Sequence, residues 1–151
     1  MQVLKILGAI WKSGANIYLD NTDNRIAIKH QDLIPAEVMQ AAEQNFQQID
    51  DWFKSWKNAS NEKVTLMKMV YQICGWQHNE KLNDWLCTEV ESLDMFNDWM
   101  IVLANNGWND IYDDYRQFEN EESNEIAQEL YNRAVKYAKK GGEHAGQGNN
   151  R

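Results

Sequence analysis

Apolar positions change their spacing within the first 30 residues of the chain. An apolar stripe at intervals of three and four predicts an amphipathic helix over residues 2–13, and Gly14 stands where a helix commonly ends. The stripe consists of Val3, Leu4, Leu7, Ile10 and Trp11. Two runs of strict alternation follow, joined by polar residues 21–24, and this pattern predicts a β-hairpin. Its inner face is expected to hold Ile17, Leu19, Ile26 and Ile28, and its outer face Tyr18, Arg25 and Lys29.

A second helix is predicted to start at Pro35, which is favoured in a first helical turn. Its apolar stripe continues to about Trp56. The stripe consists of Val38, Ala42, Phe46, Ile49, Trp52 and Phe53. A lone two-stranded hairpin is marginally stable in water, so we expect the flanking helices to cover its inner face.

Helical spacing dominates from Asn58 onward, with short connections that favour a compact bundle. The expected N-caps are Ser60, Asn79 and Ser92. Val90 is expected to face inward. A helix is predicted to end at Asn105-Asn106-Gly107, and the last helix is predicted to begin at Glu121. Trp56, Trp76 and Trp99 fall off their local stripes, and we expect them at the seam between the two units; exposed anchors for a partner are the alternative.

These patterns predict an α+β fold that is predominantly α. A small helix–β-hairpin–helix unit (residues 1–57) is expected to pack on an acidic helical bundle (residues 58–140). Residues 141–151, GGEHAGQGNNR, have no apolar side chain larger than Ala and are predicted to be a disordered tail.

The net charge of −8 is unevenly distributed. Residues 1–57 contain 6 basic and 7 acidic residues, whereas Glu80–Glu129 contains 14 acidic residues and only Lys81 and Arg116 as bases. The second region would repel phosphate, so we expect no direct nucleic-acid binding there. No apolar run approaches the roughly 18 residues of a membrane span, and no convincing signal peptide is present. We therefore expect a cytoplasmic protein without membrane contact.

Residues 3–56 resemble the TubC N-terminal docking domain family, the β-hairpin docking domains of some nonribosomal peptide and polyketide synthetase subunits. The matching positions run in order along the chain: Leu4, Leu7, Gly14-Ala15-Asn16-Ile17-Tyr18-Leu19, Arg25-Ile26-Ala27-Ile28, Leu33, Pro35, Phe46, Ile49 and Phe53. The resemblance covers about a third of the chain and implies a helix–strand–strand–helix fold with a further helix.

In that family, the hairpin captures a short acidic C-terminal tail of an upstream subunit, which adds alongside the hairpin as an extra strand. The resemblance therefore implies a partner-binding site on the hairpin of this chain. Its residues would be Tyr18, Arg25, Ala27, Lys29 and His30.

No residue pattern in the chain predicts an enzyme or a cofactor. Cys74, His78 and Cys87 are the nearest approach to a zinc site, but no fourth ligand is evident and Gly75 breaks the helix between the first two. We expect no metal and interpret the cysteines as core thiols.

An acidic surface that mimics nucleic acid is the alternative function. It would inhibit a DNA- or RNA-binding enzyme, as phage anti-defence proteins do, by occupying a basic groove. Its residues would be Asp94, Asp98, Asp110, Asp113, Asp114, Glu119, Glu121 and Glu122. The leading hypothesis is a docking or adaptor protein that binds another protein along its hairpin. The sequence leaves the identity of the partner and the oligomeric state open.

Overall fold

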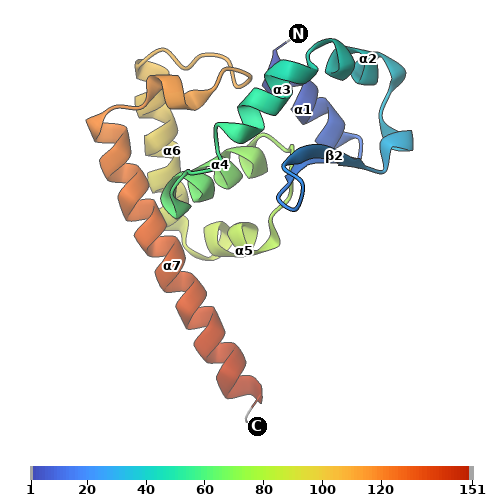
Figure 1. The fold of residues 1–151 in the computed structure, drawn as a ribbon. Helices are drawn as coiled ribbons and strands as arrows, with labels where there is room; N and C mark the ends of the chain where they lie inside the picture. The colour runs from blue at the N-terminus through green and yellow to red at the C-terminus, as the bar shows by residue number, and fades with distance from the viewer. Residues whose placement is uncertain (1, 150–151) are drawn as a thin grey trace.

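The fold consists of a hairpin unit and a helical bundle that pack against each other (Figure 1). The computed structural model describes the backbone of residues 2–149 and the side chains of residues 2–141. The hairpin unit contains α1 (Val3–Lys12), β1 (Asn16–Asp20), β2 (Arg25–Lys29), a 3-10 turn η1 (Gln31–Leu33), α2 (Ala36–Gln44) and α3 (Phe46–Lys54). The bundle contains α4 (Asn61–Ile73), α5 (Glu80–Thr88), α6 (Val90–Asn105), a 3-10 turn η2 (Tyr115–Phe118) and α7 (Glu121–Asn149). The predicted α+β, predominantly α fold class is confirmed.

The hairpin has the predicted strands, and three of its four predicted inner residues pack on the core, whereas Leu19 is only half-buried. β1 and β2 are antiparallel, with Tyr18 opposite Ala27 and Ile17 opposite Ile28. Ile17 is buried, and Ile26 and Ile28 pack against the core of α1, α2 and α3. The polar side chains therefore lie on the opposite face, because side chains alternate along a strand.

The helix predicted from Pro35 to Trp56 is two helices. α2 ends at Gln44 and α3 begins at Phe46, because Asn45 leaves the helical conformation (φ −116°, ψ 23°) and its side-chain amide donates to the Ala41 carbonyl at 2.8 Å. Asparagine competes for backbone groups in this way and so interrupts helices. The break changes the helical phase, and Phe46, predicted to be inside, is 53% exposed.

Two of the three predicted bundle caps are confirmed. Ser60 accepts from the Lys63 amide and Asn79 from the Leu82 amide. Ser92 is not a cap: α6 begins at Val90 after Glu89, and the fully buried Ser92 hydroxyl donates to the Glu89 carboxylate at 3.0 Å. Since α5 ends at Thr88, Val90 opens a new helix and is 63% exposed rather than buried.

The two units share apolar contacts at a seam of aromatic residues. Trp76, which follows α4, and Tyr71 of α4 belong to the core of the hairpin unit, and Trp76 stacks on Tyr112. Trp56 contacts Tyr115 and has the Arg116 guanidinium 3.9 Å from its ring centre. Trp99, expected at the seam, lies instead in the bundle core, stacked on Phe96. The seam therefore holds the two units together through side chains from both.

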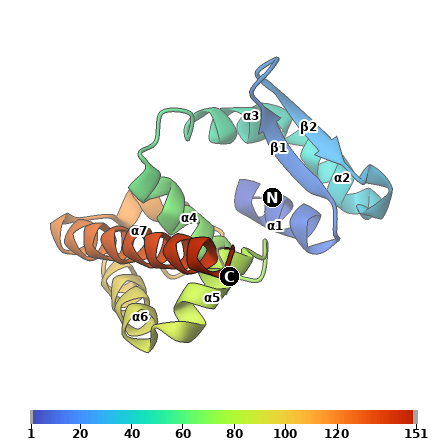
Figure 2. The same cartoon turned by 90° about the horizontal axis from the view of Figure 1, so that it is seen from below.

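α7 is the longest helix, and Figure 2 shows it running across the bundle. Asn120 and Ser123 form a reciprocal cap at its start: each side chain accepts from the other's backbone amide at 2.8 Å. The helix continues to Asn149, past Lys140, where we expected it to end; no proline stops it. Of the predicted tail, residues 150–151 and the side chains of residues 142–149 lie outside the described residues. No helix in the described part is long and apolar enough to cross a membrane.

Candidate functional site

The five residues predicted for partner binding lie on or next to one face of the hairpin. In the pairing register, Arg25 is opposite Asp20 and Lys29 is opposite Asn16. The Lys29 ammonium lies 5.4 Å from the centre of the Tyr18 ring. Ala27, opposite Tyr18, is half-buried, while Arg25, Lys29 and His30 are exposed. These residues form a surface with positive charges and an aromatic ring around the small side chain of Ala27.

The two edges of the hairpin differ in what covers them. β1 lies against α1 and α3, and the Trp11 indole donates to the Ile17 carbonyl at 3.2 Å. β2 lies on the side of the hairpin away from α1 (Figure 2). Its only backbone ladder in the described part of the chain is with β1. The open edge is therefore β2.

The Trp11 contact also shows which backbone groups β2 presents. In an antiparallel pair, residues that direct their N–H and C=O groups inward alternate with residues that direct them outward. The Ile17 carbonyl points away from β2, so the 17–28 pair is an outward-facing one, and so is the 19–26 pair. Ile26 and Ile28 therefore direct their N–H and C=O groups toward solvent at the β2 edge.

Asp20 shares the outer face with Arg25 and Lys29 and adds one negative charge to it. Asp20, opposite Arg25, accepts from both the hydroxyl and the amide of Thr22. These bonds, with a smaller contribution from the Lys29 charge, lower the pKa of the Asp20 carboxyl. Asp20 therefore stays ionised, and its carboxylate orders the turn through Thr22. No ion pair in the described part of the chain involves Arg25 or Lys29, so both cations face solvent.

Leu33 is a candidate contact that sequence reasoning did not assign to the site. It follows His30, whose left-handed conformation (φ 60°) ends β2, and its side chain is 49% exposed near Gly14. This exposed leucine lies just after β2 in the chain and beside Gly14, which precedes β1. Its signals in the sequence are its place after the second strand and its match to the docking-domain pattern.

The eight acidic residues of the alternative site do not act as one free surface. Three of them have internal partners: Asp113 accepts from Gln2, Asp114 pairs with Arg116, and Glu119 lies 3.4 Å from Lys63. Asp110 caps a turn through the Tyr112 amide. Four exposed carboxylates remain, divided between α6 and the start of α7: Asp94, Asp98, Glu121 and Glu122.

Cys74, His78 and Cys87 do not converge. Cys74 is half-buried at the end of α4, and burial raises the pKa of its thiol. Cys87, predicted to be a core thiol, is exposed on α5, where the polar Asn83 side chain is its contact. His78 approaches the Gln72 amide at 3.3 Å. Among the described residues, no three His, Cys, Asp or Glu side chains are grouped to hold a metal ion.

Comparisons with protein-family models, with curated proteins and with solved structures find no match to this chain.

Proposed function

We propose that this chain is a cytoplasmic, non-enzymatic docking or adaptor protein that binds a short extended segment of another protein along β2. The observation that carries the proposal is the uncovered β2 edge, where Ile26 and Ile28 direct backbone N–H and C=O groups outward. An extended peptide satisfies such groups by adding a strand, which gives affinity with little dependence on sequence.

The side chains around this edge favour an acidic segment. Arg25 and Lys29 are the first and last residues of the strand, and His30 follows it. None of them has an ion-pair partner in the described part of the chain. Cationic side chains beside a strand edge also discourage pairing with a second uncharged edge. A segment with carboxylates two residues apart would place both on the face that carries Arg25 and Lys29. Tyr18 and Leu33 add aromatic and apolar contacts.

The test is capture of partners from the native host by immobilised wild type and by Arg25→Glu/Lys29→Glu, quantified by mass spectrometry. The matched control is Lys136→Glu/Lys139→Glu, which makes the same charge change at exposed sites on α7. Reversal at the hairpin should lower the affinity for the partner about tenfold or more, because each exposed pair contributes up to about 1 kcal/mol and reversal turns attraction into repulsion.

A partner retained by wild type and the α7 variant, but lost by the hairpin variant, supports the proposal. Equal retention by all three proteins contradicts it. Circular dichroism of each variant checks that the fold is intact.

The acidic-inhibitor hypothesis makes a different prediction in the same experiment. A nucleic-acid-binding enzyme would be retained by both variants and displaced by DNA or RNA, with binding that weakens steeply as salt rises. We rank this function second, because three of its eight proposed acids have internal partners.

A further inference from the structure

α7 carries opposite charges in its two halves. Residues 121–129 contain four acidic and no basic side chains, and residues 130–140 contain four basic and no acidic ones. The acids are Glu121, Glu122, Glu125 and Glu129; the bases are Arg133, Lys136, Lys139 and Lys140. We refer to these eight residues as the charged stripe.

The charged stripe lies on one face of the helix. Its members follow one another mainly at intervals of three and four, which places them within an arc of about 120° for a helix with 3.6 residues per turn. Ala127 and Leu130 lie on the opposite side and are buried in the bundle. Seven of the eight charged residues are exposed, and Arg133 is half-buried. Solvent therefore faces a helix surface that is negative at one end and positive at the other.

Contacts within the chain do not account for these charges. Arg133 approaches Glu129 at 3.3 Å and Glu91 at 3.8 Å. The other six members, Glu121, Glu122, Glu125, Lys136, Lys139 and Lys140, have no ion pair in the described part of the chain. The helix dipole acts within the last turn, whereas Lys140 lies about two and a half turns before Asn149.

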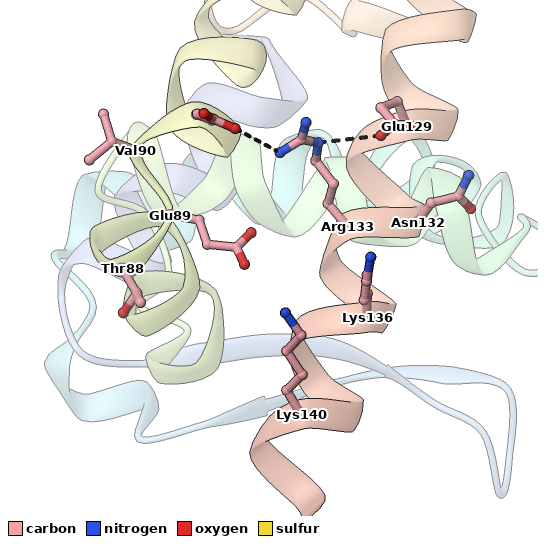
Figure 3. A pocket seen from close by; sticks show the side chains of 9 residues that line it. Thr88, Glu89, Val90, Glu129, Asn132, Arg133, Lys136 and Lys140 are labelled. Carbon is pink, nitrogen blue, oxygen red and sulfur yellow. Dashed lines mark ion pairs between the residues drawn. The ribbon is translucent and has the colours of Figure 1, made fainter. Parts of the chain in front are cut away.

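A cleft of about 670 Å³ runs beside the basic half of the charged stripe, between α7 and the junction of α5 and α6. Figure 3 shows the side chains of Lys136 and Lys140 extending from α7 on this side, across from Glu89. Val90, an exposed apolar residue, lines the opposite wall. The Glu89 carboxylate already accepts from the Trp85 indole and the Ser92 hydroxyl, so the two lysines are left for another acidic group.

We propose that this surface binds a second copy of the chain, with the two α7 helices antiparallel. If the two-fold axis crosses the helices level with residues 130 and 131, three acids of one copy meet three bases of the other, while Glu129 and Arg133 keep their pairing within one helix. Glu121 then meets Lys140, Glu122 meets Lys139, and Glu125 meets Lys136, and the symmetry repeats each pair. A parallel arrangement would oppose like charges along the whole stripe. Charge complementarity thus selects the antiparallel dimer.

The interface is mainly polar, so its stability should depend on salt and protein concentration. Exposed ion pairs are individually weak, and ions screen them beyond about 10 Å at 0.1 M salt. The dimer should therefore form at low salt and high protein concentration and dissociate as salt is raised.

Sedimentation velocity of the full chain at about 0.05 M and about 0.5 M salt tests the proposal. Two variants break the pairing: Lys136→Glu/Lys139→Glu and Glu122→Lys/Glu125→Lys. A third variant with all four substitutions exchanges the charges and should restore the dimer. The hairpin variant Arg25→Glu/Lys29→Glu is the matched control, and it should dimerise as wild type does. Circular dichroism checks that each variant is folded.

At low salt, wild type, the variant with all four substitutions and the hairpin control should be dimers. The two breaking variants should associate at least tenfold more weakly. A wild type that is monomeric at both salt concentrations would overturn the proposal. Breaking variants that associate as wild type does would also overturn it, as would a variant with all four substitutions that remains monomeric. Loss of partner capture by the hairpin variant leaves this result unaffected, so the two proposals fail independently.

Discussion

Gly8 shows how one residue fixes the approach of the two units. It lies in the interior of α1, where glycine costs about 0.5–1 kcal/mol relative to alanine. A Cβ at this position would lie 2.9 Å from Nε1 of Trp76. Trp76 is 3% exposed and held between Tyr71 and Tyr112, so its ring has little room to move. The glycine therefore allows α1 to pack closely against the indole.

Gly8→Ala should lower the free energy of unfolding by about 1 kcal/mol, because an overpacking cost of about 1–3 kcal/mol exceeds the gain in helix propensity. Gly141→Ala is the matched control: nothing lies within 4 Å of its added Cβ, and this change should be neutral or slightly stabilising. Urea denaturation measures both. A Gly8→Ala protein as stable as Gly141→Ala would show that Trp76 adjusts without cost.

At the scale of elements, the sequence predicted the helices, strands and caps that depend on residues close together in the chain. Helix α1, the two strands, and the caps Ser60 and Asn79 follow from spacing and short-range hydrogen bonding. The break at Asn45 was missed, because a continuous apolar stripe outweighed one polar residue. The start of α6 was missed because Ser92 is also a good cap. Its hydroxyl instead donates to Glu89, three residues earlier, and only the packing of the bundle buries it.

The start of α7 depends on Asn120. This residue and Ser123 satisfy two amides that would otherwise be unpaired at the helix start. Asn120→Ala should therefore lower the free energy of unfolding by about 1 kcal/mol, as loss of an N-cap generally does. The control is Asn124→Ala, an exposed position within the same helix, which should be neutral. Equal effects of the two substitutions in thermal or urea unfolding would argue against the cap.

At the scale of the whole molecule, long-range packing decides what the sequence pattern left open. The sequence predicted a two-part fold and a cationic hairpin face, but not whether the bundle covers the hairpin edge. Trp76 and Tyr71 join the core of the hairpin unit next to α1, so the bundle packs on the α1 side of this unit. β2 lies on the side away from α1. The dispersal of the acidic residues among internal partners likewise depends on contacts between distant segments, such as Asp113 with Gln2.

Amide hydrogen exchange along β2, followed by NMR in the free protein and after addition of the captured partner, tests the central claim most directly. In the free protein, the amides of Ile26 and Ile28 should exchange fast and the amide of Ala27 slowly, because only the last donates to β1. Partner binding should slow exchange at Ile26 and Ile28. A partner that binds while both amides still exchange fast would contradict strand addition along this edge.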